Sequence, residues 1–268
     1  MKRSIGPPVA VITLILSAAA SQAHYNMLLP DSWSAKKGET VGITYQWGHP
    51  FEHQLFDAPL PEAVLLLSPG GAKTIDLSRT RQEIKVVGEG QKKVAAHRFQ
   101  LTPEERGDYV IVLQVPPIWM EEEQEFLNDK VKAVLHVQAQ KGWDREVSSS
   151  EYPLDLVPLT RPYGLQPGMV FQAQVRVLGK PVSGTLVEIE RYNPAPPDKL
   201  PRDEHITRTA KSDPSGVVTA TLTDPGWWCL TAQQDAGKKM HDGKEYPVRR
   251  RVTFWVYVDE RSESKSSK

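Results

Sequence analysis

Four of the seven histidines in this sequence have positions that suit metal binding. His24 directly follows an apolar run that ends in the small residues "AASQA". His49 and His53 lie four residues apart in "WGHPFEH", and His136 lies within the apolar run "VKAVLHVQAQ". The glycine and proline of "WGHPFEH" disfavour a helix, so we expect a loop there whose two imidazoles can converge on one point. Imidazole nitrogens are good ligands for nickel, copper, zinc and cobalt.

The position of His24 matters because residues 1–23 have the pattern of a secretory signal peptide. Two basic residues precede an apolar core of about 12 residues, and Ser21 and Ala23 form a small-x-small cleavage site. The core is too short for a membrane-spanning helix, which needs about 20 residues. We therefore expect cleavage after Ala23 and a location outside the cytoplasm, in the periplasm. An uncleaved N-terminal anchor is the alternative.

An N-terminal histidine offers two ligands, its backbone amine and its Nδ1 atom. The second donor adds little ordering cost once the first is bound, because its effective concentration is high. The amine must lose a proton to bind, and its ordinary pKa is about 7.7–8.0, so we expect affinity to fall in mild acid. One or two further histidines complete such a site. His49 is the first choice, His136 the second, and His53 either completes the shell or orients a ligand.

Each candidate also has a structural explanation. His24 can belong to a disordered terminus, the "GHPFEH" histidines to an exposed turn, and His136 to a hydrogen-bonded core position. The other three histidines are expected at surface positions: His97, His205 and His241.

Composition excludes several classes of function. The chain has 33 Lys and Arg against 33 Asp and Glu, with no basic run that favours nucleic acid or a membrane surface. Cys229, the one cysteine, cannot form an intramolecular disulfide, and its apolar context "GWWCLTA" predicts a buried, inert thiol. No paired carboxylates, phosphate-binding loop or nucleophile motif stands out, so we predict a protein that is not an enzyme.

Short runs rich in β-branched and aromatic residues predict an all-β fold. Runs such as "VFQAQVRV" alternate with the period of two that a half-buried strand requires, and turn residues separate them. The one helix candidate is "EEEQEFLND". We expect two antiparallel β-sandwich domains in tandem, over residues 24–155 and 156–262, the second transthyretin- or fibronectin-like, with a disordered tail at 263–268.

The ordered series of motifs resembles a known family. The segments "AHYNMLLPD", "GHPFEH", "GDYVIVLQVPPIW", "VLHV", "GWD", "PLTRPYGLQPGMVFQ" and "DPGWWCLTA" are similar to those of the exported, NikK-like nickel-uptake proteins, a family of unknown function associated with energy-coupling-factor nickel/cobalt transporters. The resemblance implies a periplasmic protein that captures nickel, or cobalt, and delivers it to a membrane transporter component. It implies metal ligation by His24, His49 and His136, with His53 matching only part of the family.

Three other functions are consistent with the same residues. A periplasmic copper protein is one, since nitrogen ligands also suit Cu²⁺ and the Irving–Williams order favours it. An N-terminal histidine with one more histidine also fits a copper oxygenase of the histidine-brace type, although the chain has no disulfide, which such enzymes often contain. The third is a structural two-sandwich module whose histidines bind nothing.

Overall fold

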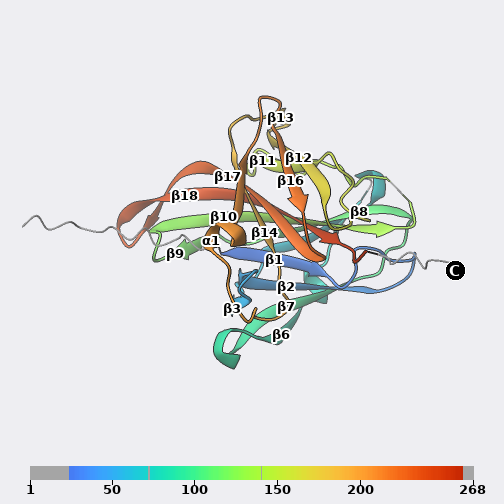
Figure 1. Ribbon diagram of the computed structural model, residues 1–268, viewed down its shortest axis with the longest axis horizontal. Helices are drawn as coiled ribbons and strands as arrows, with labels where there is room; N and C mark the ends of the chain where they lie inside the picture. The colour runs from blue at the N-terminus through green and yellow to red at the C-terminus, as the bar shows by residue number, and fades with distance from the viewer. Residues whose placement is uncertain (1–23, 72, 140, 262–268) are drawn as a thin grey trace, which may run out of the picture.

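Three layers of β-sheet make up the molecule (Figure 1). The computed structural model describes residues 24–261 except 72 and 140. The predicted signal peptide, 1–23, and the predicted tail, 263–268, lie outside the described residues. No helix in the described part of the chain is long and apolar enough to cross a membrane.

The first layer is an antiparallel sheet that contains the N-terminal strand. Its order is β1-β2-β7-β6, and β3 pairs with the end of β2. Its strands are β1 (Tyr25–Pro30), β2 (Val41–His49), β3 (Gln54–Phe56), β6 (Gln82–Val87) and β7 (Lys93–Leu101). The β2–β3 turn therefore carries the "GHPFEH" segment.

The central layer is a nine-stranded sheet with the order β15-β14-β17-β18-β10-β8-β4-β5, and β9 pairs with β10. Its pairs are antiparallel except β10 with β18, which run parallel. Its strands are β4 (Ala63–Leu67), β5 (Thr74–Asp76), β8 (Gly107–Gln114), β9 (Ile118–Met120), β10 (Glu125–Val137), β14 (Leu186–Arg191), β15 (Arg208–Lys211), β17 (Gly226–His241) and β18 (Lys244–Val258).

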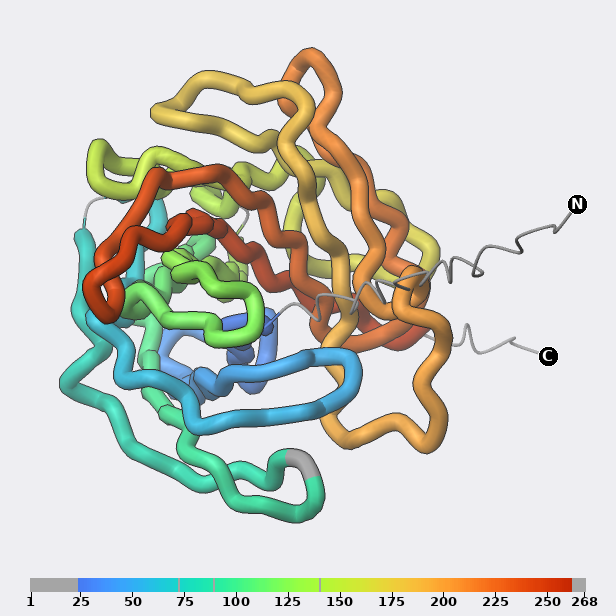
Figure 2. The backbone as a smooth tube through the Cα atoms, turned by 90° about the vertical axis from the view of Figure 1, so that its left-hand side faces the viewer, coloured from blue at the N-terminus to red at the C-terminus, as the bar shows by residue number. Residues whose placement is uncertain are grey.

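The third layer is a small antiparallel sheet on the other face of the central one. Its strands are β11 (Leu154–Pro158), β12 (Met169–Val177), β13 (Lys180–Pro181) and β16 (Val217–Leu222). In the end-on view of Figure 2, yellow and orange segments lie above the red strands of the central sheet, with the blue and teal first sheet below. The helical segments are short: α1 (Asp203–Ile206) and 3₁₀ turns at Pro69–Gly71, Ser78–Thr80 and Glu89–Gln91.

Both faces of the central sheet are buried, which gives the molecule two hydrophobic cores. Along β8, Tyr109, Ile111 and Leu113 face the core shared with the first sheet, whereas Val110 and Val112 face the core shared with the third. Successive side chains of a strand point to opposite faces, so a strand buried on both sides reads as the unbroken apolar run "YVIVL".

The all-β prediction is confirmed, with sandwich-like layers of antiparallel sheets. Strands from both sides of the expected boundary at residue 155 enter the central sheet, and the parallel β10–β18 pair joins them. The two sandwiches therefore share their middle layer. Cys229 is fully buried and free, as predicted, and burial raises the pKa of its thiol.

The helix expected at "EEEQEFLND" is wrong. Residues 121–124 form a turn and β10 begins at Glu125. The turn reverses the chain at Gln124, whose φ of 55° lies in the left-handed region, and it joins β9 to β10. Pairing with β9 and β18 supplies the backbone hydrogen bonds that a helix of this length lacks.

Candidate functional site

The structure brings His24 and His49 together. In the antiparallel β1–β2 pair, Tyr25 lies opposite Gly48. His24, which precedes Tyr25, therefore lies beside His49, which follows Gly48. The two imidazole ring centroids are 4.3 Å apart, with a tilt of 48° between the ring planes. Two imidazoles at this separation can serve one metal ion after small side-chain rotations.

Aromatic side chains form the walls around this pair. Trp47 stacks on the His24 ring at 5.5 Å between centroids, and Phe56 lies 5.4 Å from His24 and 5.8 Å from His49. His49 is 4% exposed and His24 is half-buried. These apolar neighbours lower the local dielectric constant and limit the rotamers available to the imidazoles.

A buried ion pair of the central sheet fixes the start of β1. Nη2 of Arg251 donates to the His24 carbonyl at 2.7 Å and to Oδ2 of Asp129 at 2.6 Å, and its Nε donates to Asp129 Oδ1 at 2.8 Å. Asp129 also accepts a hydrogen bond from Asn26 Nδ2 at 2.7 Å. The hydroxyl of Tyr25 donates to Glu188 Oε2 at 3.1 Å. Each of the first three described residues is therefore bonded to the central sheet.

The β2–β3 turn is held by the end of β14 and the residues that follow it. The Asn193 backbone N–H donates to the Pro50 carbonyl at 2.9 Å, and its Nδ2 donates to the Phe51 carbonyl at 2.5 Å. The Phe51 N–H donates to Glu190 Oε1 at 3.2 Å. In Figure 2 the orange chain after β14 lies beside the blue loop that contains this turn.

Glu190 is an unusual residue beside that turn because no cation pairs with its buried carboxyl group in the described structure. Burial, together with the nearby Glu52 and Glu188, raises its pKa to about 8, although hydrogen bonds from Thr207 and Phe51 oppose this shift. The side chain is therefore largely protonated at neutral pH.

His53 lies in the turn that follows His49 but has a separate partner. Its backbone has a left-handed φ of 55°, and its Nδ1 is 2.9 Å from the Asn193 carbonyl oxygen. This distance fits an Nδ1–H donor, which commits one ring nitrogen and leaves Nε2 for any other role. The geometry favours His53 as a residue that secures the turn.

The structure does not bring His136 to His24 and His49. His136 follows Asp129 by seven residues on β10, which places it roughly 20 Å from the His24 carbonyl at the usual rise of a strand. Its Nδ1 is 2.8 Å from Asp108 Oδ1, and its ring stacks on Tyr163 at 4.3 Å. A ligand set of His24, His49 and His136 around one ion is therefore incompatible with this fold.

The remaining histidines lie outside this pair, and one of them differs from the prediction. His97, expected at the surface, is 3% exposed and stacks on Tyr45 at 5.7 Å. Burial lowers the pKa of its imidazole. The face of β7 that carries this imidazole is therefore covered by other parts of the protein.

The terminal amine of a chain that begins at His24 would be a third donor beside the two imidazoles. Across residues 24–261, apart from 72 and 140, no three His, Cys, Asp or Glu side chains are grouped to hold one ion. Two imidazoles and the amine of a chain that begins at His24 supply three nitrogens from two residues, which suits square-planar or tetragonal Ni²⁺ and Cu²⁺.

The residues that support the site do not stand out in the sequence: Asn26, Asp129, Glu190, Asn193 and Arg251. Their one sequence signal is a polar or charged residue within a strand-like run, as in "EFLNDKVKAVLHV" and "RRRVTFWVYV". That signal does not separate a buried network from a solvated strand face, because both read as polar positions.

Comparison with known proteins gives a family without an assigned function. Residues 21–236 match the family model described as "Domain of unknown function (DUF4198)". No curated protein matches.

Solved structures give only remote similarities. A mutant of Salmonella alpha-2-macroglobulin is 15% identical with a TM-score of 0.28, and 87% of this chain covers 15% of it. Escherichia coli alpha-2-macroglobulin is 14% identical with a TM-score of 0.26, and 88% of this chain covers 20% of it. The Yersinia pseudotuberculosis adhesin InvE is 12% identical with a TM-score of 0.23, with 85% and 58% of the two chains covered. The chain thus spans no more than a fifth of the two macroglobulins, and these scores carry no argument about function.

Proposed function

This chain belongs to the DUF4198 family, and we propose that it is an exported, non-enzymatic protein that binds a divalent transition metal. The cargo is Ni²⁺, or Co²⁺, held by the amine and Nδ1 of His24 and by the imidazole of His49. The protein delivers this ion to a membrane transporter component. This proposal requires cleavage after Ala23, because the nitrogen of a peptide bond is a poor ligand compared with a free amine.

The observation that carries the proposal is the 4.3 Å approach of the His24 and His49 rings where the start of β1 is fixed to the central sheet. Termini are commonly disordered unless something ties them down. Here the His24 carbonyl accepts a hydrogen bond from the buried Arg251, and the ring lies between Trp47 and Phe56. Such anchoring removes ordering cost from metal binding.

Copper is the second candidate cargo, and the geometry is a specific reason to keep it. A site with two imidazoles and one amine contains only nitrogen ligands, and the Irving–Williams order then places Cu²⁺ above Ni²⁺ and Co²⁺ in affinity. Selection for nickel depends on supply, on coordination geometry or on the transporter. The same three-nitrogen set is the one a histidine-brace oxygenase uses, so turnover with a reductant and peroxide distinguishes that activity from binding.

The test is a calorimetric titration of the mature protein, beginning at His24, with Ni²⁺, Co²⁺, Cu²⁺ and Zn²⁺. Intact mass first establishes the N-terminus. The matched control is the same chain with one alanine added before His24, which moves the amine away from the imidazole and leaves every other residue unchanged. The ranking of the four metals then gives the intrinsic preference of the site.

We expect one-to-one binding that the added alanine weakens by at least about 100-fold, since even residues outside the ligand shell cost about 10–100-fold when changed. Equal binding by the two forms would exclude the terminal chelate. Absence of binding by both would leave the structural module as the better explanation.

A further inference from the structure

We infer that the C-terminal half of the chain is part of the metal site, with Arg251 of β18 as a positioning residue for the terminal chelate. The inference rests on the proposed function, and it gives that half a part in metal binding. Arg251 does not touch the metal; it acts through the His24 carbonyl.

The guanidinium of Arg251 occupies a fixed place between the two halves. It is 3% exposed and bonds both carboxylate oxygens of Asp129, which is 2% exposed. A bidentate pair of this kind has a defined orientation, because the planar guanidinium matches the carboxylate geometry. The second N–H of Nη2 donates to the His24 carbonyl, 2.7 Å away.

Asn26, two residues after His24, ties the same segment to the same network. Asn26 Nδ2 donates to Asp129 Oδ2 at 2.7 Å, and Asn26 Oδ1 accepts from the Tyr45 hydroxyl at 2.7 Å. Trp255 of β18 donates its Nε1–H to the Asn26 carbonyl at 3.1 Å. The segment is therefore fixed from the central sheet below and from β2 beside it.

A chelate formed by the first residue needs this restraint more than an internal ligand does. The terminal residue has a neighbour on one side only, so its backbone can rotate unless its carbonyl is held. Holding the carbonyl keeps the Cα of His24 beside His49, and the amine and Nδ1 then reach a metal with little further ordering.

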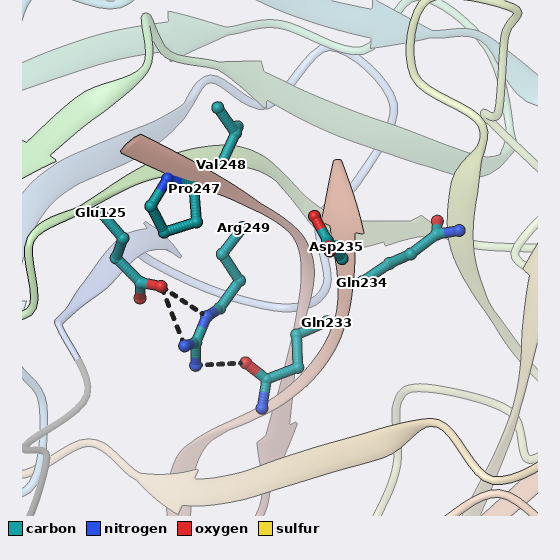
Figure 3. Close-up of a pocket in the computed structure, with 7 residues that line it drawn as sticks. All are labelled: Glu125, Gln233, Gln234, Asp235, Pro247, Val248 and Arg249. Atoms are coloured by element: carbon teal, nitrogen blue, oxygen red, sulfur yellow. Dashed lines mark hydrogen bonds and ion pairs between the residues drawn. The ribbon is translucent and has the colours of Figure 1, made fainter. Parts of the chain in front are cut away.

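A purely structural role for Arg251 is the competing explanation, since its pair with Asp129 also stabilises the sheet. The chain offers a matched control two residues away on the same face of β18. Arg249 pairs with Glu125 Oε2 at 2.9 Å and donates to Gln233 Oε1 at 3.0 Å, at the pocket drawn in Figure 3. Arg249 thus bonds to β10 and β17, whereas Arg251 bonds to β10 and to the start of β1.

The experiment compares Arg251→Gln with Arg249→Gln in the mature chain. Cu²⁺ serves as the probe for affinity and for the electron paramagnetic resonance spectrum, and hydrogen exchange of the peptide from His24 to Leu29 is followed without metal. We expect Arg251→Gln to weaken Cu²⁺ binding by about 10–100-fold, to alter the spectrum and to speed exchange in that peptide. We expect Arg249→Gln to change none of the three. If Arg251→Gln does not fold, Arg251→Lys takes its place, because a lysine keeps the charge opposite Asp129 but lacks the fork that also reaches His24.

Native affinity, spectrum and exchange in the Arg251 variant would overturn the inference, as would equal losses in both variants. The two proposals fail differently. If the unmutated protein binds no Cu²⁺, Ni²⁺ or Co²⁺, the proposed function fails. Faster exchange confined to the Arg251 variant then still supports the positioning of His24, and unchanged exchange overturns it.

Discussion

At the residue scale, the fold keeps His136 apart from His49, although the sequence places both in one candidate set of metal ligands. His49 lies in contact distance of His24, whereas His136 is anchored by the buried Asp108 at a distant part of β10. The mid-strand position of His136 identifies neither which end of the molecule it occupies nor which residues face it. That information depends on how β10 pairs with β8 and β18, which sequence periodicity does not reveal.

This separation predicts different effects for two single substitutions. His49→Ala removes one of three nitrogens and is expected to weaken metal binding by at least about 100-fold. His136→Asn keeps a polar group opposite Asp108 and is expected to leave affinity within about threefold of the original. Calorimetric titration of both variants with Ni²⁺ and Cu²⁺ makes the comparison. A large loss in His136→Asn with its fold intact would contradict the site described above.

Glu190 gives a second prediction, for stability as a function of pH. Its pKa is about 8 in the folded protein and near the ordinary 4.5 in the unfolded chain, so the folded state retains a proton that the unfolded state releases between these values. Its contribution to the free energy of unfolding is therefore fully present below about pH 4.5. It is lost as pH rises through about 8, by on the order of a few kcal/mol at most.

Glu190→Gln imitates the protonated acid and removes that dependence. We expect thermal melts of the metal-free variant to match the unmutated protein near pH 5 and to lie above it at pH 8.5. The control is Glu188→Gln, two residues away on β14, for which no comparable gain at pH 8.5 is expected. If the melting temperatures of Glu190→Gln and the unmutated protein differ by the same amount at every pH in this range, Glu190 is not protonated in the fold.

At the element scale, the β2–β3 turn depends on one glycine. Gly48 has φ of 145°, and a Cβ atom there would lie 2.0 Å from the Gln54 carbonyl oxygen. Gly48→Ala is therefore expected to destabilise the protein by about 2 kcal/mol or more and to move His49 away from His24. Denaturant unfolding measures the first effect and metal titration the second.

The control for this substitution is Gly38→Ala. Gly38 has a φ of 82°, also in the left-handed region, but a Cβ there meets nothing within 4 Å. We expect a smaller cost from conformation alone and unchanged metal affinity. Equal losses of stability in the two variants would mean that the contact with Gln54 contributes nothing.

Strands were predictable from the sequence where alternation or unbroken apolar runs were clear. The runs "TVGITYQW", "GDYVIVLQV" and "MVFQAQVRV" correspond to β2, β8 and β12. The acidic segment at 121–125 was not, because its helix propensity carries no information about its pairing partners. Tertiary pairing of β10 with β18, more than a hundred residues later, decided that segment.

The candidate site was predictable in part for a similar reason. Adjacency of His24 and His49 follows once β1 and β2 pair in register, and both lie at strand ends that a sequence can locate. Arg251 and Asp129 meet only through the parallel β10–β18 pair, whose existence composition and periodicity do not indicate.

At the scale of the whole molecule, the shared central sheet argues against independent halves. The linker composition near residue 155 resembles a domain boundary, yet β10 and β18 lie side by side across it, and Trp255 of β18 packs in the core of the first sheet. Separating the halves would expose both faces of this seam and break the buried pair of Arg251 with Asp129.

The mature protein is therefore expected to unfold in one calorimetric transition, with equal van't Hoff and calorimetric enthalpies. Because the proposed metal site lies at the first sheet and its His24 carbonyl is held by Arg251 of β18, we expect metal saturation to stabilise the whole unit. A metal present at 100 times its Kd adds about 2.7 kcal/mol to the free energy of unfolding, so the single transition moves upward without splitting. The chain with an alanine before His24 should show the same transition and a much smaller shift, of about 0.4 kcal/mol or less at the same metal concentration. Two transitions, of which metal moves only the first, would mean that the halves unfold separately and that the seam between β10 and β18 contributes little to their stability.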